Sequence, residues 1–126
     1  MTTKNLSTLT DDALVEQFAK CGEVRGEAII EGDVPRATRA AYQMRALDQE
    51  FHRRGALVRA LLLPLLEGHS YAVRYYAGLR LLSSFPIPAR TAIASVPAEA
   101  YSSIAAEARG TLRRWDSGEL SPDWCP

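Results

Sequence analysis

Apolar residues recur along this chain at the spacing of α-helices, most clearly at residues 61–82. Residues 61–66 read Leu-Leu-Leu-Pro-Leu-Leu, and residues 73–82 carry apolar side chains with a 3.6-residue period. Pro64 lies inside the first run, where it removes one helical hydrogen bond and kinks the rod. The pattern predicts two short helices packed back to back. Such a pair buries its apolar faces only by stacking on neighbours.

The N-terminal half begins with a strong helix start signal. Thr10 precedes two aspartates, which favours an N-cap followed by an acidic first turn, and the apolar pattern continues to Glu31. The expected buried positions are Leu14, Val15, Phe18, Cys21, Ala28 and Ile29. Gly22 and Gly26 interrupt this pattern, and Arg25 projects toward its apolar face. We therefore expect a break at residues 22–26, in preference to a continuous helix that packs the Arg25 stem and lets its head reach water.

A second long helix is predicted between two glycines. Gly32 ends the first helix, Asp33 and Pro35 start the next one, and Gly55 stops it after Arg54. Its expected buried stripe is Ala37, Ala40, Met44, Leu47 and Phe51. The residues expected to face away from that stripe are Arg39, Gln43, Glu50 and Arg53.

The C-terminal half predicts four further helices. Residues 56–67 are apolar on every side, which predicts burial against both neighbours. Ser70 is the expected cap of a helix over residues 71–83, and a short helix follows at residues 89–95. The last helix is expected to start near Pro97, to run through Tyr101 and to stop before Gly118.

The predicted fold class is all-α, because no stretch shows the alternation expected of a strand. Six helices with short connections predict about three antiparallel hairpins stacked into an α-α superhelix. The expected organisation is a flexible leader at residues 1–9, a single helical domain at residues 10–116 and a tail at residues 117–126.

Four motifs occur in a characteristic order: residues 14–18 (Leu-Val-Glu-Gln-Phe), residues 53–55, residues 73–74, and Leu112 with residues 115–118. In this order and spacing they resemble the motifs of a small prokaryotic family of HEAT-like, armadillo-type domains of unknown function. The resemblance implies an armadillo-like fold without an established activity. The chain departs from the pattern at residues 68–70, where HEAT-like turns usually carry Asp or Asn, and at Thr38, where the family tends to have Asn.

Composition narrows the function classes. Fifteen basic and fifteen acidic residues leave a net charge of zero, whereas nucleic-acid binders usually carry a basic excess. The N-terminus lacks the apolar core of a signal peptide, and no apolar run is long enough to cross a bilayer. We therefore expect a cytoplasmic protein with a protein partner, with nucleic acid disfavoured and no membrane association.

Candidate catalytic and metal-binding residues are few. His52 and His69 have no Cys or carboxylate at metal-ligand spacing, and Cys21 lies on an apolar helical face where packed thiols are inert. The sequence therefore predicts no enzymatic activity, no metal and no cofactor.

Four carboxylates are the candidate binding residues. If the first helix is continuous, Asp12, Glu16, Glu23 and Glu27 fall within a narrow arc of it, and we call this set the acidic ridge. One interpretation is a docking strip for a basic partner, and the other is a solvated face, since Lys20 shares the arc.

Arg74 is expected to be a structural tie. In HEAT-like units the arginine at this place pairs with an acidic group, and the expected partner here is a carboxylate or a carbonyl.

The sequence thus favours a non-catalytic protein-binding domain, such as an adaptor or an immunity protein that neutralises a toxin. The alternative is an accessory HEAT-like protein that binds nucleic acid through Arg36, Arg39, Arg53 and Arg54 with tyrosine stacking.

Overall fold

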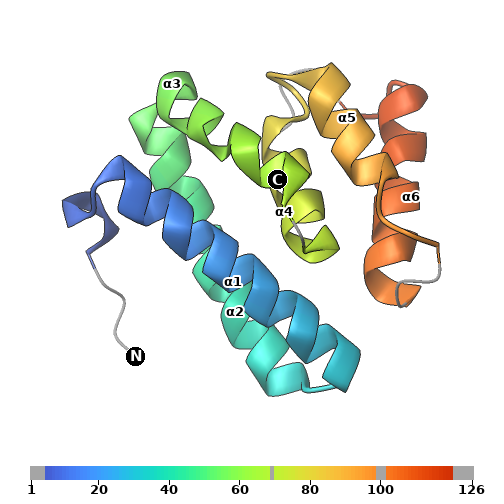
Figure 1. Cartoon of the computed structure of the whole chain (residues 1–126), viewed down its shortest axis with the longest axis horizontal. Coiled ribbons are helices and arrows are strands. Elements are labelled where there is room, and N and C mark those ends of the chain that lie inside the picture. Colours follow the sequence, from blue (N-terminus) through green and yellow to red (C-terminus); the bar gives the residue numbers. More distant parts are fainter. Residues whose placement is uncertain (1–4, 69, 99–101, 121–126) are drawn as a thin grey trace. The chain divides into compact units, whose positions relative to one another are not determined.

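A computed structural model describes residues 5–68, 70–98 and 102–120 of the chain. Every regular element in these ranges is helical, and the prediction of an all-α chain is confirmed. The α-helices are α1 (Asp11–Glu31), α2 (Val34–Arg54), α3 (Ala56–Arg59), α4 (Tyr71–Leu81), α5 (Pro86–Ala94) and α6 (Ser102–Asp116). Two 3₁₀ helices, η1 (Leu6–Thr8) and η2 (Ala60–Glu67), complete the set (Figure 1).

The chain divides into two compact units, residues 1–62 and residues 63–126. The first contains η1, α1, α2 and α3, and the second contains α4, α5 and α6, while η2 spans the border. The stacked superhelix and the borders of the predicted domain, residues 10 and 116, stay predictions.

The first unit is built on the pair α1 and α2, which lie side by side (Figure 1). The Thr10 hydroxyl caps α1 by accepting from the Ala13 amide at 3.1 Å, as predicted. Gly32 ends α1 with a φ of 72°, a left-handed conformation that glycine adopts at little cost. Between the helices, the Phe18 and Phe51 rings meet edge to face with centroids 5.9 Å apart.

The predicted break in α1 is wrong, because the helix is continuous from Asp11 to Glu31. Gly22 and Gly26 are both buried, so their low helix propensity is outweighed by packing that small residues permit. Helices α1 and α2 approach each other closely next to Gly22, where the Cys21 thiol donates to the Ala40 carbonyl of α2 at 3.2 Å. Arg25 is half-buried within this helix, which fits the alternative of a packed stem.

Glu50 was expected to face away from the buried stripe of α2, and this expectation is wrong. Its side chain is only 10% exposed, and it lies beside the buried Phe51. The carboxylate is tolerated there because two arginines donate to it.

The apolar segment at residues 56–67 also differs from its prediction. It forms a four-residue α-helix followed by a 3₁₀ helix that contains Pro64, which lacks an amide proton to donate. Leu62 and Leu66 are buried, but Leu57 is 88% exposed. Burial on every side was therefore the wrong expectation for this segment.

The second unit packs α4 against α5 and α6. The Ser70 hydroxyl caps α4 as predicted, accepting from the Val73 amide at 3.2 Å. Helix α5 begins at Pro86, earlier than predicted, because proline suits the first helical turn. Pro97 lies outside the last helix, α6, which begins at Ser102, and Tyr101 lies outside the described residues. The large buried side chains of this unit include Val73, Tyr75, Tyr76, Leu81, Leu82, Ile93 and Ile104.

Candidate functional site

The acidic ridge lies along one side of α1. Its four members, Asp12, Glu16, Glu23 and Glu27, are all exposed. Because α1 is continuous, a regular advance of about 100° per residue keeps their side chains within one arc. With a rise of 1.5 Å per residue, the ridge extends over roughly 22 Å. A single rigid helix therefore fixes the spacing of these charges.

Three members of the ridge have no bonding partner in the described part of the chain. Within the described part of the chain, no ion pair or hydrogen bond engages the side chains of Asp12, Glu16 or Glu23. Glu27 differs, because its Oε1 accepts from Arg36 Nη2 at 3.0 Å. Exposed carboxylates of this kind contribute little to folding stability but do contribute to the electrostatic field outside the protein.

A groove runs between α1 and α2 next to the ridge, and we call it the basic groove. It has a volume of about 400 Å³. The lining residues are Gln17, Lys20, Cys21 and Val24 from α1, and Arg36, Arg39, Ala40 and Gln43 from α2. Arg36 and Arg39 were candidates for the nucleic-acid alternative, but the sequence pattern does not indicate a groove, because its walls come from two different helices.

Cys21 lies in the groove but is a poor nucleophile. Burial raises the pKa of its thiol to about 11, and the nearby Arg25 charge offsets this only in part. The thiol is therefore protonated at neutral pH, and its proton is donated to the Ala40 carbonyl.

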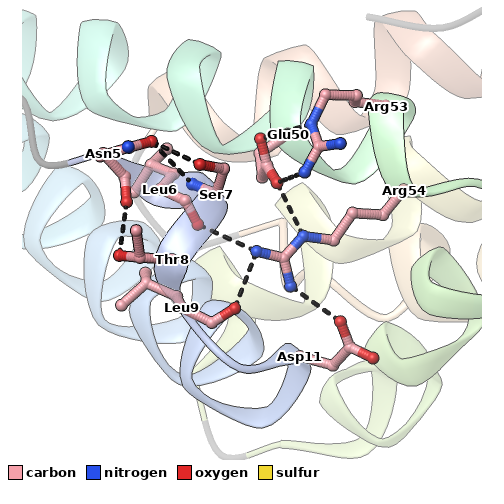
Figure 2. A network of polar contacts seen from close by, with 9 residues as sticks. All are labelled: Asn5, Leu6, Ser7, Thr8, Leu9, Asp11, Glu50, Arg53 and Arg54. Atoms are coloured by element: carbon pink, nitrogen blue, oxygen red, sulfur yellow. Dashed lines mark hydrogen bonds and ion pairs between the residues drawn. The ribbon is translucent and has the colours of Figure 1, made fainter.

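A polar cluster centred on Arg54, which the sequence pattern did not predict, joins α2 to the residues before α1 (Figure 2). Arg54 Nε donates to Glu50 Oε2 at 2.7 Å, and Arg53 donates to the same carboxylate. The other nitrogens of Arg54 donate to Asp11 Oδ1 at 2.8 Å and to the carbonyls of Leu6 and Leu9 at 2.9 and 2.8 Å. Arg54 therefore ties the segment before α1 to the end of α2, and this tie engages the predicted leader at Leu6 and Leu9.

The Arg54 cluster lowers the pKa of Glu50. Hydrogen bonds from Arg53 and then from Arg54 lower the pKa of the Glu50 carboxyl to about 2, although burial opposes the shift. The spacing of Glu50 and Arg54, four residues apart on one helix, was a local signal that could have indicated this pair. The other partners of Arg54, at Leu6, Leu9 and Asp11, are distant in sequence and gave no such signal.

Arg74 links two segments of the second unit. Its Nη1 donates to the Gly68 carbonyl at 2.7 Å, and its Nε donates to the Ser95 hydroxyl at 3.1 Å. Ser95 donates in turn to the Ala92 carbonyl at 2.6 Å. These bonds join the turn before α4 to the end of α5. How much stability depends on Arg74 stays a prediction.

The described residues contain no group of three or more His, Cys, Asp or Glu side chains that could hold a metal ion. Among them, His52 Nδ1 lies 3.3 Å from Arg59 Nη2, whereas His69 falls outside the described ranges. No helix in the described ranges combines the length and the apolar character that a membrane span requires.

Comparison with known proteins places the chain in a family. The family model described as "Domain of unknown function (DUF2019)" matches residues 12–116, which include the whole acidic ridge, the basic groove, Arg54 and Arg74. The chain belongs to the DUF2019 family.

A solved structure shares the fold of this DUF2019 chain. The crystal structure of the protein RPA1889 from Rhodopseudomonas palustris CGA009 is 26% identical in sequence, with a TM-score of 0.85. The similarity covers 96% of this chain and 100% of that chain. No curated protein matches. Neither the family description nor the name of the similar protein states an activity.

Proposed function

We propose that this chain is a non-catalytic protein-binding domain that docks a basic segment of a partner protein on the acidic ridge. The observation that carries the proposal is the set of exposed carboxylates of Asp12, Glu16 and Glu23 on one continuous helix, which have no partner among the described residues. Their fixed spacing within a ridge of roughly 22 Å suits a partner with several cationic side chains rather than a single ion.

The physical benefit of such a ridge is kinetic and selective. A single exposed ion pair contributes little affinity, because water and salt screen it. Several like charges on a rigid helix instead create a field that steers an oppositely charged partner and disfavours acidic ones. We therefore expect the ridge to speed association and to select the partner, while apolar contacts supply most of the affinity.

The non-catalytic part of the proposal is supported by Cys21. Its raised thiol pKa and its hydrogen bond to Ala40 keep it from acting as a nucleophile at neutral pH. A cytoplasmic HEAT-like domain that serves as an adaptor or an immunity protein is the finer form of this proposal, and it rests on resemblance and analogy.

The alternative, nucleic-acid binding, is disfavoured by the way the candidate arginines are used. Arg53 and Arg54 both donate to Glu50, and Arg36 donates to Glu27 and Glu31. Cations that are already paired with carboxylates contribute less to the release of counterions from a phosphate backbone. Together with the net charge of zero, this favours a protein partner.

Affinity capture from the source cell, followed by mass spectrometry, tests the proposal. The baits would be the wild-type chain, the double variant Glu16→Lys/Glu23→Lys, and a control, Glu67→Lys/Glu119→Lys. The control makes the same change of charge at exposed residues of the second unit. We expect a basic protein that is captured by the wild type and the control but depleted with the ridge variant. Equal capture by all three would contradict the ridge, and enrichment of nucleic acid that disappears steeply with salt would favour the alternative.

A further inference from the structure

We propose that the basic groove binds a carboxylate side chain, Asp or Glu, of the partner protein. The inference deepens the proposed function and rests on it for the class of partner. The ridge would then contact cationic residues of the partner, and the groove next to it would take an acidic residue of the same surface.

Two cationic side chains line the groove without an ion pair or hydrogen bond to the described part of the protein. Arg36 is engaged by Glu27 and Glu31, at 3.0 and 3.2 Å. In contrast, neither Arg39 nor Lys20 has an ion pair or hydrogen bond within the described residues, and both side chains are exposed. Arg39 comes from α2 and Lys20 from α1, so the two charges approach the groove from opposite walls.

The remaining lining residues suit a short acidic side chain. Cys21, Val24 and Ala40 give an apolar floor, which the thiol–carbonyl bond between α1 and α2 closes. Gln17 and Gln43 add carboxamide groups that can donate hydrogen bonds to an oxyanion. A Glu side chain has the same combination, with methylene groups that can pack on the floor and a carboxylate that can reach the cations.

The charges around the groove favour one carboxylate over a chain of phosphates. Its volume of about 400 Å³, within the roughly 300–1,000 Å³ of ligand sites, has room for one side chain. A nucleic-acid strand that followed α1 beyond the groove would meet Glu16, Glu23 and Glu27, which repel phosphate. A single carboxylate avoids them, and the guanidinium of Arg39 offers it a fork of two parallel donors.

Lys20 connects the two surfaces, because it lies in the arc of the ridge and also lines the groove. The positive charge of Lys20, which lies in the same arc, reduces the negative electrostatic field of the ridge. A partner carboxylate in the groove would neutralise this charge, and the ridge would then present a more uniform negative field to the cationic residues of the partner.

The test is a titration of the isotope-labelled full chain followed by backbone amide resonances. One probe is a short capped peptide with Glu and Asp separated by Gly and Ser, and its neutral counterpart carries Gln and Asn. A third probe is an oligothymidylate of similar length, and a fourth is a Lys-rich peptide that reports on the ridge. The variant is Arg39→Gln, and the matched control is Arg45→Gln, which removes the same charge from an exposed position of α2 outside the groove.

We expect the acidic peptide to shift the amides of residues 17–24 and 36–43, and the neutral peptide to leave them in place. Arg39→Gln should weaken this binding about fivefold, and Arg45→Gln should leave it unchanged. Absent shifts, equal loss in both variants, or tighter binding of oligothymidylate would overturn the assignment. The Lys-rich peptide separates the two proposals, because its binding along α1 tests the ridge whether or not the groove takes a carboxylate.

Discussion

At the scale of single residues, a buried carboxylate shared by two arginines is the feature most distant from the sequence expectation. Glu50 was expected to face away from the buried stripe of its helix, yet it accepts from Arg53 and Arg54 and is only 10% exposed. Arg54 in turn ties Leu6, Leu9 and Asp11 to α2 (Figure 2). The helical period alone assigned Glu50 to the outer face, because it contains no information on a charged partner that permits burial.

The Glu50→Gln variant should lose stability in a pH-dependent way. Because the pKa of Glu50 is lowered to about 2 from its usual 4.5, the ionised carboxylate stabilises the fold above about pH 4.5. This contribution is lost as the pH falls through about 2. We expect the variant to be less stable by about 1–3 kcal/mol near pH 7, in denaturant titrations.

The difference between wild type and Glu50→Gln should shrink as the pH is lowered from about 4.5 toward 2. Glu23→Gln, which alters an exposed carboxylate without a partner in the described residues, is the control and should leave the denaturation midpoint in place. A difference that stayed constant over this pH range would mean that the charge of Glu50 does not stabilise the fold.

Arg74→Ala is expected to lower stability by about 1–3 kcal/mol, because the Gly68 carbonyl and the Ser95 hydroxyl lose a donor. Thermal and denaturant unfolding would measure the loss. Arg90→Ala, which removes a surface ion pair with Asp116 in the same unit, should cost less. Loss of partner binding without loss of stability would assign Arg74 to the binding surface instead.

At the scale of elements, the sequence predicted the helix ends that carry a capping residue better than it predicted the continuity of a helix. The caps at Thr10 and Ser70 and the stop at Gly32 were correct, because capping depends on neighbouring residues. The break at Gly22 and Gly26 was wrong, because burial of these glycines depends on contacts that a single helix does not reveal.

Gly78 offers a direct test of glycine as a packing residue. A Cβ atom there would lie 2.7 Å from Ile93 Cγ1 and 3.3 Å from the Ala89 carbonyl, where α4 crosses α5. Gly78→Ala should therefore destabilise the protein by about 1–3 kcal/mol, although alanine is the better helix former. Unfolding by denaturant would show the change.

Gly110→Ala is the matched control for that variant. Its Cβ would meet only Arg113 Nη2, at 3.9 Å, so the gain in helix propensity should stabilise α6 by up to about 1 kcal/mol. Equal effects of the two alanines, in either direction, would mean that the crossing of α4 and α5 does not require a glycine at Gly78.

At the scale of the whole molecule, the sequence predicted the all-α class correctly. The family match over residues 12–116 agrees with the expectation of a small domain family of unknown function. The helical period also indicated the members of the ridge, but their place in one arc depends on the continuity of α1, which the sequence did not predict. The basic groove and the Arg54 cluster were not predictable, because their residues come from segments that only tertiary packing brings side by side.

The central claim is that the acidic ridge steers a basic protein partner, and association kinetics test it most directly. The rate constant for association of the captured partner would be measured with the wild type, with Glu16→Lys/Glu23→Lys and with Glu67→Lys/Glu119→Lys, at low and high salt. We expect the ridge variant to associate at least tenfold more slowly at low salt, with the control unchanged. The difference should fade near 1 M salt, where the Debye length is about 3 Å. An association rate that is the same for all three proteins at low salt would contradict the account and reduce the ridge to a solvated face.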